Sequence, residues 1–579
     1  MLKICNRPLD QFHIVLPEKP HPAEVHAAEL LREYAKLACG VELNGDAAIH
    51  IGGDRPTDGI CWDGFSIETD ETDLYLFGAI PRGTLYAVYG FAEKYLGIRR
   101  YAPEVTRVVA PAAETIVPNH REIDNPGFGM RINDWITHVQ DKEFAAWERM
   151  NGYALDDALG GYVVNIGHCH TFERLCPPKT YFAEHPEYYS LFNGRRIPAG
   201  NAYDSEENGQ LCLTNPDVLR IVTENVLEWL RAHPEADIVD VSQNDNDRYC
   251  QCPACAASDA EEGSPSGTIL KFVNAVAEAV EKEFPHVLVQ TFAYSYSRKA
   301  PRITKPRKNV LIRYCTIEAC FRHRLDDESC PRNAGKFAKE LKEWGAISDH
   351  IAIWDYVTNY SCYIAPFPNF EVLRENIRFF YENNAVHVFE EDTPGTRAGD
   401  LNDLQAYLIA KLLWDPMMSE ARYQTLIDEF LAAYFGAGWR QIRKYMQIAA
   451  ETTADRHMGC FEYADLGYLG SDPKSELYIP RPYAEVNEQS YLSGLTARID
   501  EVRALWDEAY AMAADAGERE RIDRCRLSID YLWLFCVKHD RDTMTPAERM
   551  AYEREVAIYY GKKQRYGIHT NIWTQRAGH

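Results

Sequence analysis

The sequence lacks the features that would place a protein in a membrane or in a nucleotide-binding class. Nowhere in its 579 residues does an apolar run approach the ~18 residues that cross a bilayer. It also has no GxGxxG after a predicted strand, no GxxxxGK[ST] and no GxSxG elbow. We therefore predict no membrane association, no cofactor and no serine-hydrolase chemistry.

Positive charge is scarce as well. The chain carries 62 Lys and Arg residues against 87 Asp and Glu residues, a formal net charge of -25. Nucleic acids and anionic membranes bind clustered Lys and Arg, so neither is expected as a partner. The first residues of the chain show no continuous apolar segment of the kind found in secretion signals. This predicts a cytoplasmic protein, or a secreted or periplasmic one if a signal has been removed.

Cysteine is not rare, at 16 residues, but it is scattered, so a disulfide framework is not expected. The exception is CQCPAC, which places Cys250, Cys252 and Cys255 close together, with Cys212 at the end of an earlier predicted strand. Four such thiolates can hold a structural zinc ion. Because only one CxxC pair is present, buried thiols or a disulfide are the alternative. We predict no catalytic metal.

The pattern of predicted elements changes twice along the chain, which is too long for a single core. Residues 1–120 predict an α+β domain, with amphipathic helices at 23–38 and 82–96 beside a small sheet. Residues 121–416 alternate between apolar strands and amphipathic helices. Residues 417–579 have a helical pattern almost throughout and predict a helical C-terminal domain.

The alternation in the middle region predicts an α/β fold, a (β/α)8 TIM barrel in which helices wrap a parallel sheet. Eight strands are predicted, at residues 129–133, 162–166, 210–213, 238–242, 288–293, 310–315, 351–354 and 386–389. The count is weakest at the second and third strands, which are separated by an insertion at 182–196. In such a barrel the active site lies at the C-terminal ends of the strands.

Carboxylates and aromatic side chains collect at these predicted strand ends. The last strand runs into Glu390, Glu391 and Asp392, three consecutive acids that must be solvated, paired or used. Acids that manage protons on a leaving oxygen, beside aromatic faces that stack on sugar rings, suit glycoside hydrolysis. The predicted catalytic carboxylates are Asp245, Glu318 and Glu390. The predicted substrate-binding residues are Arg131, His168, His170, Asn244, Tyr294, Trp354, Asp355, Tyr356 and Glu391.

Each of these residues also has a structural interpretation. Asp245 and Asp392 are in positions where an acid often caps a helix. His168 and His170 are two residues apart, as zinc ligands or as hydrogen-bonded structural histidines can be. The positions of Trp354 and Tyr356 are equally compatible with packing in a barrel wall.

Several segments together resemble glycoside hydrolase family 163, the group first catalogued as domain of unknown function 4838. They include HTFERLCPPKTYFAEHPEYYSLFNGRR at 170–196, VSQNDNDRYCQCPAC at 241–255, IRYCTIEACFRH at 312–323, WDYVTNYSCYIAPFPNF at 354–370 and VFEED at 388–392. Residues 82–104, RGTLYAVYGFAEKYLGIRRYAPE, also resemble the domain that precedes the barrel in α-glucuronidases and β-hexosaminidases.

The resemblance implies an endo-β-N-acetylglucosaminidase that cuts the GlcNAc–GlcNAc bond of N-linked glycans, with an oligosaccharide or glycan as its partner. It implies a retaining reaction in which one acid protonates the leaving oxygen. A second polar group then orients the substrate's own 2-acetamido group as it attacks C1. Two assignments stay open. Either Asn244 and Asp245 act as an adjacent pair, or Glu318 or Glu390 is the acid and Asp245 handles the acetamido group.

Two other functions are compatible with the sequence. A glucuronidase-like exo-glycosidase would need Arg or Lys for the substrate carboxylate, and Arg131 and Arg313 are the candidates. A catalytically inactive barrel would bind glycans without hydrolysing them.

Overall fold

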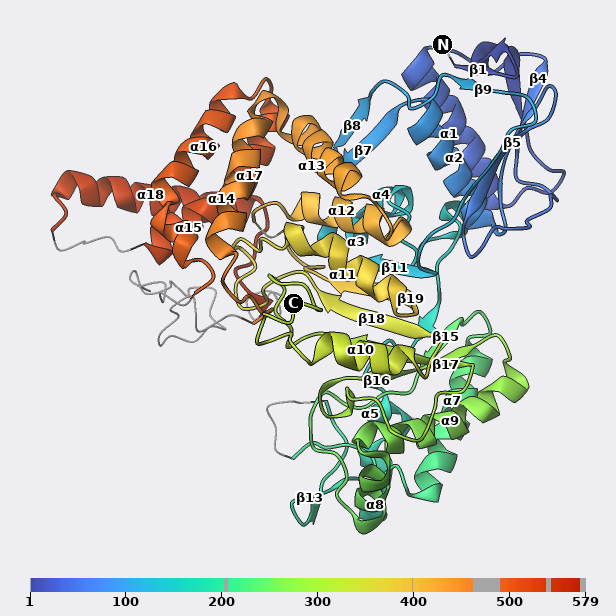
Figure 1. Ribbon diagram of the computed structural model, residues 1–579, viewed down its shortest axis with the longest axis vertical. Coiled ribbons are helices and arrows are strands. Elements are labelled where there is room, and N and C mark those ends of the chain that lie inside the picture. Colours follow the sequence, from blue (N-terminus) through green and yellow to red (C-terminus); the bar gives the residue numbers. More distant parts are fainter. Residues whose placement is uncertain (1, 202–206, 398, 462–489, 538–542, 573–579) are drawn as a thin grey trace.

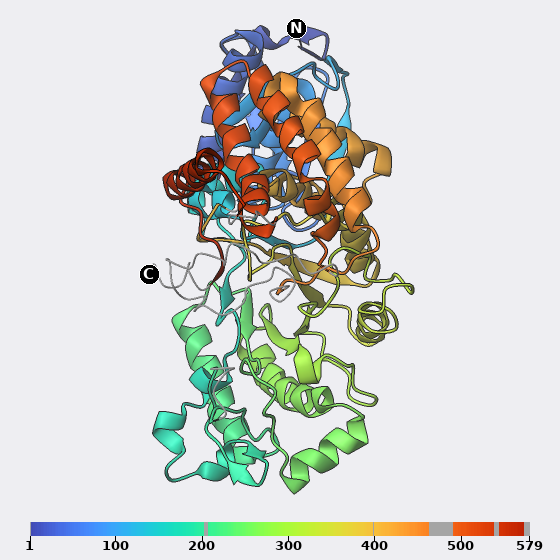
Figure 2. The ribbon, with the colours of Figure 1, turned by 90° about the vertical axis from the view of Figure 1, so that its left-hand side faces the viewer.

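The computed structural model describes residues 2–201, 207–397, 399–461, 490–537 and 543–572. A mixed sheet with two helices forms the N-terminal unit, a parallel sheet lies in the middle, and helices form the C-terminal unit (Figure 1). The blue N-terminal unit and the orange and red C-terminal helices lie above the parallel sheet in both views, and the green segments lie below it (Figures 1 and 2). No helix in the described part of the chain is both long and apolar enough to cross a membrane.

The N-terminal unit contains the two predicted helices, α1 (Pro22–Cys39) and α2 (Pro81–Tyr95). A capping box of His21 and Glu24 begins α1, and Gly40, with a φ of 69°, ends it. The five-stranded sheet has the order β10 (Arg121–Asp124), β5 (Phe65–Thr69), β6 (Leu74–Gly78), β4 (Ala47–Ile51) and β3 (Phe12–Val15). Two further sheets are formed by β2 (Arg7–Pro8), β1 (Lys3–Ile4) and β9 (Thr115–Ile116), and by β7 (Ile98–Ala102) and β8 (Val105–Val108).

The middle region is a curled, seven-stranded sheet in which every pair of neighbouring strands is parallel. Its spatial order is β11 (Met130–Asn133), β19 (Ala385–Glu391), β18 (Ile351–Tyr356), β17 (Val310–Cys315), β16 (Leu288–Ala293), β15 (Ile238–Asp240) and β12 (Asn165–Ile166). The strands predicted at 288–293 and 310–315 are confirmed residue for residue as β16 and β17.

The predicted third strand, at 210–213, was wrong, and the described residues form a half-barrel sheet instead of a full barrel. Leu211 makes only an isolated bridge to Tyr189, and β12 pairs directly with β15. The sheet is open between its two edge strands, β11 and β12. Asn151 spans this gap, because its N–H donates to the Arg131 carbonyl and its carbonyl accepts from the Val163 N–H.

The two faces of the sheet differ in what they contact. Residues alternate between the faces along each strand. A small apolar cluster joins strands from across the curl and therefore lies inside it: Met130, Ile132, Ile238, Leu311, Ala352 and Phe389. The opposite face carries residues such as Ile312, Ile353 and Val388, which belong to the large core shared with the helices.

Helices cover the outer face where the sequence predicts them. They are α7 (Pro216–Ala232), α9 (Pro265–Glu283), α10 (Phe337–Gly345), α11 (Phe370–Glu382) and α12 (Asn402–Trp414). Further helices lie before α7 or between α7 and α9: α3 (Ile136–Gln140), α4 (Lys142–Trp147), α5 (Phe172–Leu175), α6 (Pro178–Tyr181) and α8 (Pro253–Glu262).

The C-terminal unit is helical, as predicted, but one long predicted helix is divided. Its helices are α13 (Glu420–Phe435), α14 (Trp439–Thr453), α15 (Ser493–Ala497), α16 (Ile499–Met512), α17 (Ala516–Tyr531) and α18 (Pro546–Arg565). The sequence pattern over 488–516 predicts a single helix, but the chain is broken at Arg498 between α15 and α16, and residues 488 and 489 lie outside the described part of the chain.

Candidate active site

Inside the curl, polar and aromatic side chains meet at the C-terminal ends of five neighbouring strands. We call this group the strand-end site. It consists of Asp245 after β15, Tyr294 after β16, Glu318 after β17, Trp354 on β18 and Glu391 at the end of β19. Each of the five retains exposed surface, although most residues of these strands are buried. The location is the one at which enzymes with parallel α/β sheets hold their active sites.

Asp245 and Tyr294 are joined directly. The Tyr294 hydroxyl donates a 3.0 Å hydrogen bond to Asp245 Oδ1, and the Asn201 side chain accepts the Asp245 backbone N–H at 3.1 Å. Burial raises the pKa of Tyr294, and the negative charges of Asp245 and Glu318 raise it further. The phenol therefore remains protonated, and both carboxylates lie near it.

Glu318 is the most exposed carboxylate of the strand-end site, with 42% of its side chain accessible. It pairs with the guanidinium of Arg298, which follows β16 and is itself only 7% exposed. Arg298 also donates a 2.7 Å hydrogen bond to Glu340 on α10. This buried arginine fixes Glu318 at the rim and leaves part of its carboxylate open to solvent.

Trp354 and Glu391 complete the site on the other side. The Trp354 indole N–H donates a 2.6 Å hydrogen bond to Glu391 Oε2. The ring of His168 lies 5.6 Å from the Trp354 ring, and the Arg313 guanidinium lies 4.2 Å from it on the buried side. An aromatic face supported from below by a cation is suited to stacking on a sugar ring.

Glu390, predicted as catalytic, does not belong to the strand-end site. Adjacent residues on a strand face opposite ways, and Glu390 shares the outer face with Val388, whereas Glu391 shares the inner face with Phe389. Glu390 is 0% exposed, and no described residue donates a hydrogen bond to its carboxylate. Burial raises its pKa well above the usual value, and Asp355 and Asp392 add to the rise.

Two more acids occupy the outer face beside Glu390. Asp355 is the direct neighbour of Glu390 across β18 and β19, and it accepts a 2.5 Å hydrogen bond from Thr316. Burial raises the pKa of Asp355 to about 6 and that of Asp392 to about 7. The side chain of Asp355 is buried behind the sheet, away from the strand-end site, and its role in substrate binding stays a prediction.

Arg131 and Asn244 are also placed away from the strand-end site. Arg131 is 0% exposed and forms a bidentate pair with Asp63 of the N-terminal unit, at 2.8 and 3.1 Å. The Asn244 side chain is buried, donates to the Gly209 carbonyl and accepts from the Glu173 N–H. Both side chains hold the fold together, so the predicted Asn244–Asp245 pair is not available for catalysis.

The two predicted histidines and Tyr356 lie on the inner side. His170 Nδ1 lies 2.8 Å from the Gln243 carbonyl, and its ring packs against Phe292 at 5.1 Å. His168 is exposed beside Trp354. Tyr356 is only 4% exposed, so it supports the wall of the site more than it reaches a ligand.

The structure adds residues that were not predicted for the site. Asp134 after β11 accepts the Asp392 N–H at 2.5 Å, and burial followed by the charge of Glu391 raises its pKa well above the usual value. Cys460, from the C-terminal unit, contacts the Ile317 carbonyl with its thiol at 3.3 Å. No local sequence pattern marks Arg298 or Cys460, because their partners are distant along the chain.

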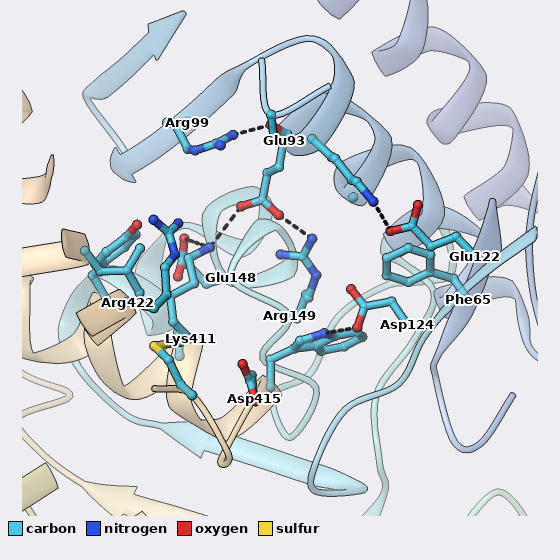
Figure 3. A pocket seen from close by; sticks show the side chains of 18 of the residues that line it. Phe65, Glu93, Arg99, Glu122, Asp124, Glu148, Arg149, Lys411, Asp415 and Arg422 are labelled. Atoms are coloured by element: carbon cyan, nitrogen blue, oxygen red, sulfur yellow. Dashed lines mark hydrogen bonds and ion pairs between the residues drawn. The ribbon is translucent and has the colours of Figure 1, made fainter. Parts of the chain in front are cut away.

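A cavity of about 310 Å³ lies elsewhere, between the N-terminal unit and α12 (Figure 3). Glu93 pairs there with Arg149 at 2.5 Å and with Lys411 at 3.0 Å, and Lys411 lies 3.6 Å from Glu148. Burial raises the pKa of Glu148 to about 7. The charged groups pair with one another, and no residue of the strand-end site lines this cavity.

The four predicted zinc ligands form one cluster. The sulfur atoms of Cys212, Cys250, Cys252 and Cys255 all lie within 4.8 Å of one another, and all four residues are buried. Cys212 lies 3.7 Å from Cys252 and 3.9 Å from Cys255. Cys212, Cys250, Cys252 and Cys255 are all present as thiols, so the structure does not support a disulfide among them.

The chain was compared with known proteins. A family model described as "Domain of unknown function (DUF4838)" matches residues 101–447. No curated protein matches the sequence.

Among solved structures, a GH115 4-O-methyl-α-glucuronidase with specificity for decorated arabinogalactans superposes with a TM-score of 0.54 at 11% identity, covering 97% of this chain and 77% of that one. A GH138 enzyme targeting pectin rhamnogalacturonan II superposes with a TM-score of 0.48 at 10% identity, covering 96% of this chain and 92% of that one. A GH20 chitobiase from Flavobacterium johnsoniae gives 0.43 at 10% identity, covering 96% of each chain. At such low identity, the first of these likenesses concerns the fold alone.

Proposed function

This chain belongs to the DUF4838 family, and from that premise we propose that it is a glycoside hydrolase that cleaves a β-linked N-acetylglucosamine bond. The observation that carries the proposal is the group of Asp245, Tyr294 and Glu318 on three adjacent strand ends, with Trp354 beside it. The fold shared with the GH115 glucuronidase is consistent with this chemistry but does not specify the sugar.

In the proposed reaction, Asp245 orients the substrate's 2-acetamido group. Its carboxylate accepts the acetamido N–H while the Tyr294 hydroxyl holds the carboxylate in place. The acetamido oxygen then attacks C1 as the bond to the leaving oxygen breaks. Fixed polar groups that match developing charge stabilise such a transition state more than mobile water does.

Glu318 is assigned as the general acid and base. It is the carboxylate with the most open surface, so a leaving oxygen at the mouth of the site can reach it. Glu318 protonates that oxygen, and the resulting carboxylate then takes a proton from the water that opens the cyclic intermediate. Glu391, with Trp354, forms the wall that holds the sugar ring.

The glucuronidase alternative lacks its predicted arginines. Arg131 is paired with Asp63 on the far side of the sheet. Arg313 is 1% exposed and lies beneath Trp354, where it donates to the His168 carbonyl at 3.1 Å. Neither guanidinium is open to a substrate carboxylate, so a neutral sugar suits the site better.

An assay with three substrates tests the proposal: an aryl β-N-acetylglucosaminide, an aryl glucuronide and a glycan with a chitobiose core. We expect hydrolysis of the chitobiose-core glycan or the N-acetylglucosaminide, and turnover at least ~100-fold lower in Glu318→Gln. Preferential hydrolysis of the glucuronide would overturn the choice of sugar. Binding of the glycan without hydrolysis would overturn the enzymatic function and support a glycan-binding barrel.

A further inference from the structure

A second cluster of metal-binding side chains joins the loop after β17 to the C-terminal unit. Cys320, His323, Cys330 and His457 each place one ligand atom within 4.8 Å of those of the others. The Cys320 sulfur lies 3.3 Å from His323 Nδ1, and the Cys330 sulfur lies 3.6 Å from His457 Nδ1. Both cysteines are buried, whereas both histidines are partly exposed.

The surroundings of this cluster orient its ligands. His323 Nε2 lies 3.0 Å from the Ala454 carbonyl, so it carries the proton and leaves Nδ1, 3.3 Å from the Cys320 sulfur, with a lone pair for a metal. The Met458 N–H donates to the Cys320 sulfur at 3.4 Å, which stabilises a thiolate. Metal-binding histidines typically donate their second N–H to a backbone carbonyl in this way.

One buried side chain holds the loop that carries three of the four ligands. The Asn333 amide accepts the Cys320 N–H at 2.8 Å and donates to the carbonyls of Cys320, His323 and Arg324. Asn333 is 0% exposed. The loop is therefore shaped around the ligands before any ion binds, which lowers the entropy lost on binding.

We propose that Cys320, His323, Cys330 and His457 bind a structural zinc ion. Zinc prefers four ligands in a tetrahedron, and Zn–S and Zn–N bonds of about 2.3 and 2.05 Å place sulfur and nitrogen about 3.5 Å apart. The observed sulfur–nitrogen separations of 3.3 and 3.6 Å fit this edge. A closed set of two thiolates and two imidazoles suits a structural site and not a catalytic one.

The Cys212, Cys250, Cys252 and Cys255 cluster independently supports a second zinc ion. Its sulfur–sulfur separations of 3.7 and 3.9 Å match the edge of about 3.8 Å in a tetrahedral four-sulfur site. Arg196 donates to the Cys250 sulfur at 3.7 Å and supplies positive charge, and the Leu191 N–H donates to the same sulfur at 3.4 Å. The chain therefore binds two zinc ions.

We call the site of Cys320, His323, Cys330 and His457 the mixed site, because it combines sulfur and nitrogen ligands. It also helps to position a catalytic residue, and this step rests on the proposed function. Glu318 lies two residues before Cys320. On the partner segment, Cys460 lies three residues after His457 and contacts the Ile317 carbonyl. Zinc would thus hold the segment just after Glu318 in place, while Cys460 contacts the segment just before it. The metal acts here as a positioning element and takes no part in bond cleavage.

Zinc analysis of the purified full-length protein tests the proposal directly. Elemental analysis is expected to give two zinc ions per chain, one in Cys330→Ser and in His457→Ala, and two in the control Cys176→Ser, which removes a buried thiol outside both clusters. Zinc X-ray absorption of the unmodified protein should show on average about three sulfur and one nitrogen ligands per ion. This measurement does not depend on the variants folding.

The possible results distinguish a failure of the zinc proposal from a failure of the proposed function. One zinc ion with four sulfur ligands, or no zinc, would overturn the mixed site. Oxidised Cys320 and Cys330, found as two missing thiols in a titration of the unfolded, chelated protein, would overturn it as well. If zinc analysis gives two ions but the protein hydrolyses none of the three substrates, the metal proposal stands and the proposed function fails.

Discussion

The Tyr294 hydroxyl donates a 3.0 Å hydrogen bond to Asp245, and these two residues come from loops after adjacent strands, β16 and β15. The pair therefore joins the loops after two neighbouring strands, and Glu318 follows β17, the next strand in the sheet. Burial and two nearby carboxylates keep the phenol protonated, so it acts as a permanent hydrogen-bond donor. The pair is the part of the site most directly open to test.

Replacing Tyr294 with Phe removes the donor and keeps the ring. We expect kcat on an N-acetylglucosaminide to fall about 10- to 100-fold, because Asp245 loses the bond that orients it. KM should change less than kcat, since the aromatic surface remains. Steady-state kinetics of Tyr294→Phe measure this split. Unchanged kcat would show that the hydrogen bond plays no part in the reaction.

Glu318→Gln tests the assignment of the general acid. Turnover should fall at least ~100-fold, because an amide cannot transfer a proton to the leaving oxygen. Folding should be preserved, since Arg298 keeps its 2.7 Å hydrogen bond to Glu340. Glu340→Gln is the matched control, which removes the other carboxylate around the same arginine. Near-normal activity in Glu318→Gln with normal melting would remove Glu318 from the mechanism.

Glu390 and Glu391 form a matched pair of neighbours on opposite faces of β19. Glu391→Gln is expected to reduce kcat/KM at least ~10-fold, because its carboxylate lies in the site and accepts the Trp354 N–H. Glu390→Gln should leave activity within about threefold, because burial and the charges of Asp355 and Asp392 raise the pKa of Glu390 and favour its neutral form, which the amide mimics. If Glu390→Gln instead lowers activity more than Glu391→Gln in parallel assays, then Glu390 faces the site and Glu391 faces outward.

Glu148 makes the stability of the fold depend on pH. Burial raises its pKa from 4.5 to about 7 in the folded chain, so the folded state retains a proton that the unfolded state releases. Its contribution to stability is therefore greatest at low pH and falls as the pH rises from about 4.5 to about 7.

Glu148→Gln should abolish the loss of stability that occurs as the pH rises from about 4.5 to about 7. The variant is expected to melt at the wild-type temperature near pH 4.5 and at a higher temperature at pH 8, by an amount equivalent to at most about 3 kcal/mol. Melting curves between these pH values provide the measurement, with Glu553→Gln, an exposed residue, as the control. A lower melting temperature than wild type at pH 8 would show that the ion pair with Lys411 dominates.

The ion pair between Asp63 and Arg131 connects the N-terminal unit to the sheet. Both side chains are 0% exposed, and Arg131 together with Arg82 lowers the pKa of Asp63 despite its burial. Asp63→Asn leaves a buried cation without its counter-ion, which typically costs 3–5 kcal/mol. Denaturation of this variant should show that loss, while exposed Asp58→Asn should not. Equal stability of the two would mean that water reaches Arg131.

Much of the fold could be predicted because its strands are short apolar runs between amphipathic helices. Residues 310–315 are an example, since they are buried throughout and form β17 without adjustment. Residues 210–212 are also buried but form no strand. Gln210 instead bonds to the carbonyls of Asn244 and Asn246, and Cys212 joins the thiol cluster. Burial alone does not distinguish a strand from a loop packed around a site.

The site was harder to predict than the fold. The run at 386–392 showed that Glu390 and Glu391 face opposite ways, but its apolar residues occupy both faces, so it could not show which acid faces inward. The mixed site of Cys320, His323, Cys330 and His457 was not predicted, because His457 lies more than a hundred residues from the other three ligands. Spacing rules for metal sites apply to ligands from one local segment and give no signal for such a distant one.

The His457 and Asp63 contacts have a consequence for how this protein can be divided. The segment that defines the family ends at residue 447, before His457 and Cys460, and starts at residue 101, after Asp63. A fragment cut at those limits would lose a ligand of the mixed site and the counter-ion of a buried arginine. The stretch by which relatives are recognised is therefore narrower than the stretch that these contacts join. Gene fusions or domain exchanges should keep both flanking units with the sheet.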